Sequence, residues 1–215
     1  MSGPGGPLIA VVDYGMGNRR SVEKALAHVG ARATVSAEPA VLRSAEGLVL
    51  PGVGAFPRAM ANLRELSLDE LLRERMAEGV PLLGLCLGMQ LLFESSTELG
   101  GASGLGFLRG TVDRLETGGL KLPHIGWNRV TWRRSSELTS GLPAQCAFYH
   151  VHTFVPRPAE QQDLLGTGDY GGDFASAVAH PERPLYGVQF HPEKSSGHGL
   201  RLLGNFAAVC ARVTA

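Results

Sequence analysis

Short apolar runs alternate with amphipathic, helix-length segments over the first hundred residues of the chain. The runs, which we predict to be strands, cover residues 8–12, 33–36, 47–50 and 81–85. Helices are predicted between them, one from an Asn18 N-cap to Gly30 and two more over 59–66 and 68–76, because apolar residues recur there every three or four positions. Strands joined by helices pair in parallel through right-handed crossovers, so this half predicts a mainly parallel sheet flanked by helices.

The pattern changes after about Leu99 to closely spaced β-type segments. We predict strands over 107–115, 127–132, 146–154, 175–179 and 185–190, and a last helix over about 199–211. The sequence has no repeat, no low-complexity linker and no clear domain boundary. We therefore predict an α/β fold with a mainly parallel central sheet, a β-rich second half, and one domain over residues 1–215.

Charge and cysteine content exclude several classes of protein. Twenty basic residues balance twenty acidic ones without a basic run, which argues against nucleic acid or an anionic membrane as partner. The cysteines, Cys86, Cys146 and Cys210, are widely spaced, which argues against a disulfide framework or a metal site. Without a signal-peptide pattern or an apolar stretch of membrane-spanning length, we expect a soluble, cytoplasmic protein.

Glycine-rich motifs that bind cofactors are weak or missing. Gly15-Met16-Gly17 lacks the third glycine of a dinucleotide fingerprint, and Gly104-Leu105-Gly106 does not follow a clear strand. A Walker A sequence is also absent. We expect a protein that works without a cofactor.

Cys86 lies in the sequence GLCLG, with Gly84 and Gly88 two residues away on either side. If a strand ends at Leu85 and a helix begins near Leu87, the cysteine occupies a sharp turn in which small residues relieve crowding. Free N–H groups at a helix start also favour a thiolate. The motif predicts a nucleophile, and the alternative is a cysteine that packs as a small hydrophobe.

The tripeptide HPE occurs twice, at His180 and at His191. The first copy lies between two short strands and is typical of a turn, whereas the second follows an apolar strand, where ligand sites of parallel sheets open. We expect Pro192 to keep the second copy extended, so that His191 and Glu193 project to the same side. This pair predicts a base with its orienting acid, and the alternative is a solvated turn with a capping glutamate.

The sequence PGVG, residues 51–54, follows the third predicted strand. Gly52 and Gly54 let the peptide beside Val53 rotate at low cost. A rotated amide would supply one N–H group of an oxyanion hole, and the Leu87 amide the other. The alternative is an ordinary turn.

Together, GLCLGMQLLFE, PGVG and FHPEKS resemble the class I (triad) glutamine amidotransferases. The resemblance covers nearly the whole chain. DYGMGN, KLPHIGWNRV at 121–130, YHVHTF at 149–154 and FHPEKSSGHGLRLLGNF at 190–206 look like the glutaminase-subunit family of imidazole glycerol phosphate synthases.

This resemblance implies a role for each of several residues. The triad would be Cys86 as nucleophile, His191 as base and Glu193 as orienting acid. The residues implied to bind glutamine are Gln90, Glu98, His152, Thr153 and Phe154. Those implied at an interface with a (β/α)₈-barrel synthase subunit are Asn18, Pro123, His124, Trp127 and Lys194. Without a partner, Trp127 and Lys194 would instead be an ordinary aromatic and a solvated charge.

The family's activity is glutamine hydrolysis through a cysteine thioester, with ammonia delivered to the barrel subunit, which makes imidazole glycerol phosphate and AICAR in histidine biosynthesis. Two alternatives stay open: a glutaminase serving anthranilate or pyridoxal phosphate synthesis, and a non-catalytic regulatory subunit of the same fold. The sequence departs from the family pattern at Arg19, Arg109 and His150. These positions lie outside the triad.

Overall fold

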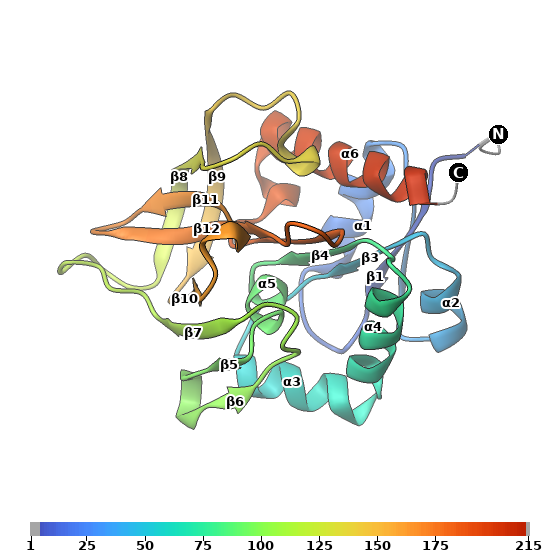
Figure 1. Cartoon of the computed structure of the whole chain (residues 1–215), viewed down its shortest axis with the longest axis horizontal. Coiled ribbons are helices and arrows are strands. Elements are labelled where there is room, and N and C mark those ends of the chain that lie inside the picture. The colour runs from blue at the N-terminus through green and yellow to red at the C-terminus, as the bar shows by residue number, and fades with distance from the viewer. Residues whose placement is uncertain (1–4, 214–215) are drawn as a thin grey trace.

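The computed structural model describes residues 5–213, and the ends of the predicted domain, residues 1–4 and 214–215, lie outside this range. Within the described range, nine strands form one sheet in the order β2-β1-β3-β4-β13-β12-β11-β8-β9. Most of these strands are labelled in Figure 1. Five neighbouring strands of this sheet pair in parallel. They are β1 (Leu8–Val12), β2 (Arg32–Ser36), β3 (Gly47–Leu50), β4 (Leu82–Leu85) and β13 (Leu185–Val188).

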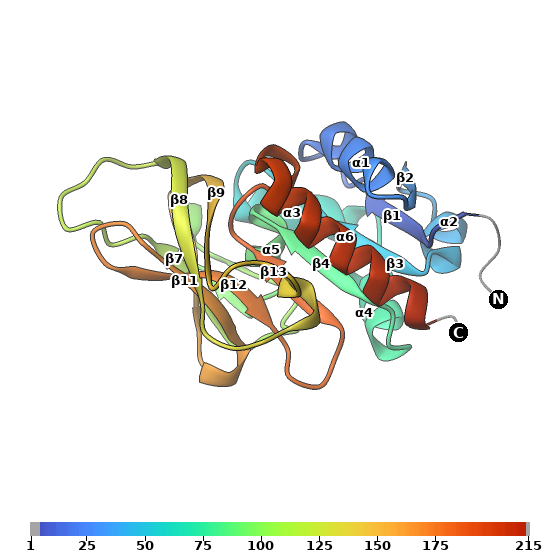
Figure 2. The same ribbon diagram turned by 90° about the horizontal axis from the view of Figure 1, so that it is seen from above.

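Helices cover both faces of the parallel strands, as Figure 2 shows from above. One face carries α1 (Arg19–His28) and α6 (Ser196–Val213). The other carries α2 (Pro39–Ser44), α3 (Phe56–Glu65), α4 (Leu68–Ala77) and α5 (Leu87–Leu91). Side chains alternate between the faces of a strand, so Val11 packs toward α1 and α6, and Val12 toward the opposite helices. Burial on both faces explains why these strands are continuous apolar runs.

The second half of the chain extends the sheet with antiparallel strands. These are β12 (Asp173–Ala179), β11 (Leu164–Asp169), β8 (His124–Trp132) and β9 (Gln145–His152). A four-stranded sheet lies beside them and contains β10 (Phe154–Pro158), β7 (Gly110–Arg114), β5 (Ser95–Ser96) and β6 (Ala102–Ser103). Short 3₁₀ turns cover Glu98–Gly100, Glu137–Thr139, Gln161–Asp163 and Pro192–Lys194.

The predicted fold class is confirmed, and the differences are local. Helix α2 was not predicted, because its six residues are too few to show a helical period. Strand β11 was also missed, since its glycines, Gly166 and Gly168, weaken the strand pattern. Both glycines leave room for aromatic rings: a Cβ atom would lie 2.8 Å from the Trp132 ring at Gly166 and 2.6 Å from the Phe174 ring at Gly168.

Several predicted boundaries were wrong. The strand expected over 127–132 begins at His124, and the helix expected over 59–66 begins at Phe56. The strand expected over 107–115 begins only at Gly110. The one expected over 146–154 is two strands that separate at Thr153. The last helix begins at Ser196, before its predicted start. In the described part of the chain, no helix combines the length and the apolar character needed to cross a membrane.

The topology brings four distant segments of the chain to one edge of the sheet. Strands β1, β3, β4 and β13 are parallel neighbours, so their carboxyl ends lie side by side. The segments that leave these ends are DYGMGN, PGVG, the turn at Cys86 and the residues up to His191. Ligand sites of open parallel sheets form at such an edge.

Candidate active site

The predicted strand-to-helix turn at Cys86 is present between β4 and α5. Cys86 has φ 53° and ψ −110°, a conformation that costs an L-residue free energy and marks functional sites. Its two flanking glycines are required by close packing. A Cβ atom on Gly88 would lie 1.7 Å from the Leu50 carbonyl oxygen, and one on Gly84 would lie 2.6 Å from the Gly88 carbonyl oxygen.

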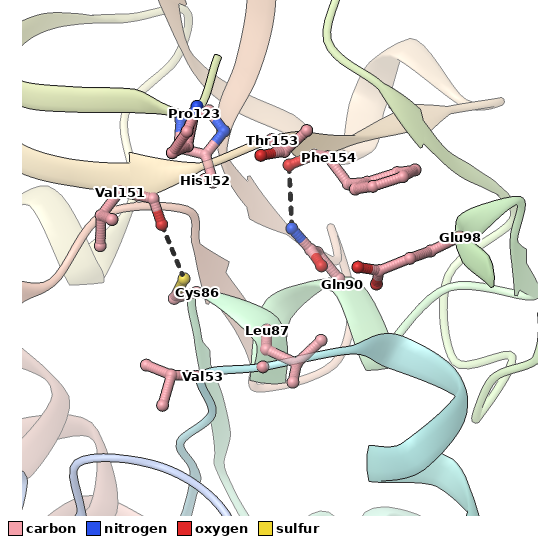
Figure 3. A pocket seen from close by; sticks show the side chains of 11 residues that line it. Val53, Cys86, Leu87, Gln90, Glu98, Pro123, Val151, His152, Thr153 and Phe154 are labelled. Carbon is pink, nitrogen blue, oxygen red and sulfur yellow. Dashed lines mark hydrogen bonds between the residues drawn. The ribbon is translucent and has the colours of Figure 1, made fainter.

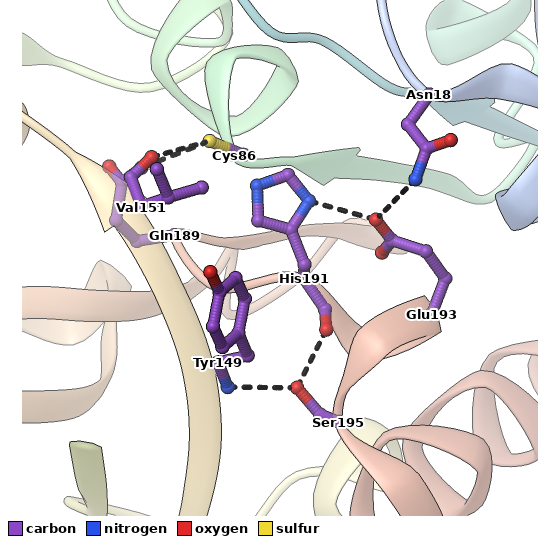
Figure 4. Close-up of polar contacts among 8 residues, drawn as sticks. All are labelled: Asn18, Cys86, Tyr149, Val151, Gln189, His191, Glu193 and Ser195. Atoms are coloured by element: carbon purple, nitrogen blue, oxygen red, sulfur yellow. Dashed lines mark hydrogen bonds and ion pairs between the residues drawn. The ribbon is translucent and has the colours of Figure 1, made fainter. Parts of the chain in front are cut away.

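The predicted pairing of His191 with Glu193 is present, and both side chains are buried. The Nδ1 atom of His191 lies 2.8 Å from Oε1 of Glu193 (Figure 4). The Asn18 side chain donates to the same carboxylate oxygen at 3.4 Å. Asn18 is the N-cap residue of α1, as predicted, but its side chain makes no capping bond.

We expected an extended segment at Pro192 to bring His191 and Glu193 together, and that expectation was wrong. Pro192 does not keep the segment extended, because residues Pro192–Lys194 form a 3₁₀ turn. Proline suits the first position of such a turn, since that position needs no N–H donor. Ser195 closes the turn by donating to the His191 carbonyl oxygen at 2.6 Å, and its hydroxyl accepts from the Tyr149 amide at 3.0 Å.

The His191 ring lies between Cys86 and Glu193 (Figure 4). Burial alone would lower the pKa of His191, but interactions with Cys86 and Glu193 outweigh burial and raise the pKa to about 10. Its Nε2 atom is buried and has no hydrogen-bond partner among the described residues. Cys86 therefore has a basic side chain held beside its sulfur, as a cysteine nucleophile requires.

Gln189 is a site residue that the sequence interpretation missed. It is fully buried, and its side-chain amide donates to the Cys86 sulfur at 3.7 Å. Its carbonyl oxygen accepts from Gln90 at 3.1 Å. The signal was a single polar residue in the apolar run YGVQF, two positions before His191.

A pocket of about 270 Å³ opens beside Cys86 (Figure 3). Its lining includes all five residues implied to bind glutamine: Gln90, Glu98, His152, Thr153 and Phe154. Gln90 donates to the Phe154 carbonyl oxygen at 2.9 Å, and the Glu98 carboxylate accepts from the Phe56 amide at 2.8 Å. Its volume is slightly below that of pockets for drug-sized ligands, which is roughly 300–1,000 Å³.

The predicted oxyanion hole is not assembled in this conformation. The Leu87 amide donates to the Gly52 carbonyl oxygen at 3.3 Å, so a carbonyl occupies the place where an oxyanion would bind. The C=O of Gly52 and the N–H of Val53 belong to one peptide and point in opposite directions. Val53 and Gly54 line the pocket, as does Leu87.

Three of the five residues implied at a partner interface are exposed. Trp127 is 56% exposed, and Pro123 and Lys194 also reach solvent. The Trp127 and Tyr149 rings meet edge to face at 6.3 Å, and Lys194 Nζ lies 6.0 Å from the Tyr149 ring. These side chains form one surface beside the His191 turn. Asn18 is partly buried.

His124 is not available as a surface contact, and that prediction was wrong. It is 3% exposed, because its strand turns this side chain inward. Its Nδ1 atom lies 3.1 Å from His152 Nε2, and its Nε2 atom lies 3.2 Å from Asn128 Nδ2. His124 therefore connects the exposed strand β8 to the wall of the pocket.

The three departures from the family pattern have different surroundings. Arg19 pairs with Asp13, and Arg109 pairs with Glu160 at 3.0 Å on the surface. His150 is fully buried, with Nδ1 3.1 Å from the Phe148 carbonyl oxygen and Nε2 2.9 Å from the Ser176 hydroxyl. Burial lowers the pKa of His150 to about 3, so its ring is neutral at physiological pH.

The other two cysteines differ from Cys86. Cys146 and Cys210 pack in the core, and burial raises the pKa of both thiols, that of Cys210 to about 12. A neutral thiol is a poor nucleophile, so neither is a second reactive cysteine. Within residues 5–213, no group of three or more His, Cys, Asp or Glu side chains is arranged to hold a metal ion.

Comparisons with known proteins find relatives that match over most of the chain. The family model described as glutamine amidotransferase class-I matches residues 10–210. The imidazole glycerol phosphate synthase subunit HisH of Moorella thermoacetica is 48% identical over 198 residues, which are 92% of this chain and 93% of that protein. The HisH subunit of Bacillus velezensis is 46% identical over 210 residues, which are 95% of this chain and 97% of that protein.

A solved structure shares the fold at low sequence identity. The structure of PurLQS from Thermotoga maritima superposes with a TM-score of 0.77 at 16% identity, covering 95% of this chain and 99% of that chain. From the family match and the two relatives, the chain belongs to the class I glutamine amidotransferases and, within them, to the HisH subunits of imidazole glycerol phosphate synthase.

Proposed function

We propose that this glutaminase uses Cys86, His191 and Glu193 to hydrolyse glutamine, and that the ammonia passes to a (β/α)₈-barrel synthase subunit. The proposal rests on the arrangement of these three residues at the pocket. The His191 ring lies between the Cys86 sulfur and the buried Glu193 carboxylate, at a pocket whose wall includes Glu98. A carboxylate in the wall of the pocket that Cys86 also lines suits the ammonium group of an amino acid.

The first half-reaction forms a thioester. The Cys86 thiolate attacks the side-chain carboxamide carbon of glutamine, and the negative charge moves to the carboxamide oxygen. The protonated His191 gives its Nε2 proton to the departing nitrogen, the carbon–nitrogen bond breaks, and ammonia leaves. Glu193 keeps the ring oriented through its Nδ1 atom and stabilises its positive charge.

The second half-reaction releases glutamate. His191 is now neutral and takes a proton from a water molecule, which attacks the thioester carbon. The carbon–sulfur bond breaks, and the thiolate returns beside the protonated ring. Gln189 stabilises this thiolate by donating to its sulfur, which it already contacts at 3.7 Å.

The conformation described here is a resting state in this proposal. The Gly52 carbonyl faces the place of the oxyanion, which it would repel. Rotation of the Gly52–Val53 peptide turns this carbonyl away and brings the Val53 amide beside the Leu87 amide. Losing one oxyanion donor costs about 100- to 1,000-fold in kcat, so the resting state hydrolyses glutamine poorly.

The surface around Trp127 and Lys194 is the proposed contact with the barrel subunit. The glutamine pocket opens beside it, since Pro123 belongs to both. Binding of the partner, and then of the ammonia acceptor, favours the rotated peptide by contacting that state better than the resting one. Glutamine is thereby not hydrolysed until an acceptor for the ammonia is present.

The test uses the assembled complex and two nitrogen sources. Cys86→Ala should lower glutamine-dependent synthesis by at least about 1,000-fold and leave synthesis from ammonium salts intact, because the barrel still receives ammonia. His191→Ala should have the same effect. Glu193→Gln should lose less of the glutamine-dependent activity, since it keeps a polar group beside Nδ1 of His191. Substantial glutamine turnover by Cys86→Ala would refute the proposed nucleophile.

A further inference from the structure

The DYGMGN segment lies directly behind the loop Pro51–Gly54, which we call the oxyanion loop. Tyr14, in this segment, is fully buried, and its hydroxyl donates to the Pro51 carbonyl oxygen at 2.6 Å. The backbone of Tyr14 is held in turn, because Asn62 in α3 donates to its carbonyl oxygen at 2.9 Å. The triad and the glutamine pocket do not account for this buried hydroxyl.

The Tyr14 hydroxyl also touches the residue whose carbonyl must move. A Cβ atom on Gly52 would lie only 2.5 Å from Tyr14 Oη. Burial raises the pKa of Tyr14 above its usual range, and nearby Cys86 raises the pKa further. The hydroxyl therefore stays protonated and remains a donor at any pH at which the enzyme works.

The chain just beyond the loop is fixed as well. The Phe56 amide, at the start of α3, donates to the Glu98 carboxylate at 2.8 Å. Hydrogen bonds to side chains thus hold Pro51, which begins the loop, and Phe56, two residues after its end. The glycine-flanked peptide at Val53 lies between these two fixed points.

We infer that Tyr14 is a positioning residue for the oxyanion loop: its hydroxyl holds the Pro51 carbonyl in place, so that the conformational change is confined to the Gly52–Val53 peptide. This inference rests on the proposed peptide rotation. Rotating one peptide requires opposite changes in ψ of Gly52 and φ of Val53 while both ends stay fixed. If the Pro51 peptide could also turn, the Val53 N–H group would be delivered less accurately to the oxyanion.

The test is Tyr14→Phe in the complete complex with saturating acceptor. We expect kcat for glutamine to fall about tenfold. This loss is smaller than the one caused by removing an oxyanion donor, because the Val53 amide is still present but less accurately placed. The KM for glutamine should stay within about twofold of wild type, because the pocket residues that contact the amino-acid end are unchanged. Synthesis from ammonium salts should be unaffected.

Two controls separate positioning from other roles. Tyr186→Phe removes the hydroxyl of another tyrosine with a buried ring, in β13 and packed toward α6. It should leave kcat unchanged, even if the melting temperature falls. The rate at which iodoacetamide alkylates Cys86 should be equal in wild type and Tyr14→Phe, located by mass spectrometry. A slower alkylation would mean that Tyr14 acts on the thiol itself and would overturn the inference.

The remaining outcomes also decide between explanations. Unchanged kcat in Tyr14→Phe with a lowered melting temperature would make Tyr14 purely structural. A rise in KM at constant kcat would make it part of substrate binding. Failure of the proposed function is visible separately, because Cys86→Ala would then retain glutamine turnover whatever Tyr14→Phe does.

Discussion

The backbone amide of Leu87 donates a hydrogen bond to the carbonyl oxygen of Gly52, with 3.3 Å between nitrogen and oxygen. Leu87 is the first residue of the helix that follows the nucleophile, so this amide points to where the oxyanion of glutamine would form. The contact therefore joins the turn at Cys86 to the glycine-rich loop, in the arrangement that we propose as the resting state.

Substitution of Gly52 should change the degree of activation more than glutamine binding. A methyl group there would lie 2.5 Å from Tyr14 Oη and 2.9 Å from Leu87 Cβ, so Gly52→Ala must displace the loop. We expect activated kcat to fall by about tenfold or more, and KM to change by less than about threefold. Steady-state glutaminase assays of the chain alone, with partner, and with partner and acceptor measure this. Equal turnover in all three wild-type assays would contradict the switch.

Gly54 offers a matched comparison with a glycine far from the site. Its φ of +111° strains any other residue, and so does the φ of +78° at Gly79. Gly54→Ala should alter activation, whereas Gly79→Ala should only lower stability, because its Cβ atom would meet nothing within 4 Å. Loss of activation in both variants would indicate a general effect of strain.

Replacing His150 should make stability less sensitive to acid. The folded-state pKa of His150 is about 3 and that of an unfolded chain is near 6.5, so the unfolded state binds the extra proton between these values. The contribution of His150 to the free energy of unfolding is therefore complete above pH 6.5. It is lost as the pH falls toward 3, at up to about 1.4 kcal/mol per pH unit. His150→Phe should remove this contribution, giving a smaller difference in unfolding free energy between pH 7.5 and pH 5 in urea titrations.

Ser176→Ala is the control for this experiment. His150→Phe also leaves the Ser176 hydroxyl without its 2.9 Å partner, which costs about 1–3 kcal/mol at every pH. Ser176→Ala removes the same hydrogen bond but keeps the titrating ring, so it should lower stability and retain the steeper pH dependence. Parallel pH curves for wild type and His150→Phe would rule out His150 as the source.

The two tryptophans should respond in opposite ways to truncation. Trp127 is 56% exposed on β8, whereas Trp132 packs against Phe148 at 5.9 Å beside the core. Trp127→Ala should weaken binding to the barrel partner by about 2 kcal/mol or more, with little change in melting temperature. Trp132→Ala should mainly lower the melting temperature. Calorimetric titration and thermal unfolding measure both, and unaltered affinity in Trp127→Ala would remove it from the interface.

Gly88→Ala should severely destabilise the fold. Its added carbon would lie 1.7 Å from the Leu50 carbonyl oxygen, so backbone atoms rather than a flexible side chain would have to move. We expect a loss of more than about 3 kcal/mol or no folded protein. Gly204→Ala, within α6, meets Val29 at an ordinary 3.8 Å and should be stabilising by up to about 1 kcal/mol. Denaturant unfolding compares the two, and a folded, stable Gly88→Ala would contradict the packing explanation.

Local patterns in the sequence determined much of this protein. Alternating apolar runs and helical periods specify a parallel α/β sheet, since each strand is buried on both faces. The spacing of His191 and Glu193 is also local, and so is the need for Gly84, whose Cβ atom would meet the Gly88 carbonyl oxygen four residues away. These features depend on neighbours within a few positions, and they can be inferred without knowing the rest of the fold. The need for Gly88 is not local, because its Cβ atom would meet the Leu50 carbonyl oxygen at the end of another strand.

Tertiary structure alone decided the remaining features. His124 is buried against His152 only because β8 and β9 pair in the observed register, which turns its side chain inward. Gln189 reaches the Cys86 sulfur because β13 lies beside β4, although the two residues are far apart in sequence. The orientation of the Gly52 carbonyl is likewise set by the Leu87 amide, since glycine on its own accepts either peptide orientation at similar free energy. Each outcome depends on contacts between segments that meet only after the sheet has formed.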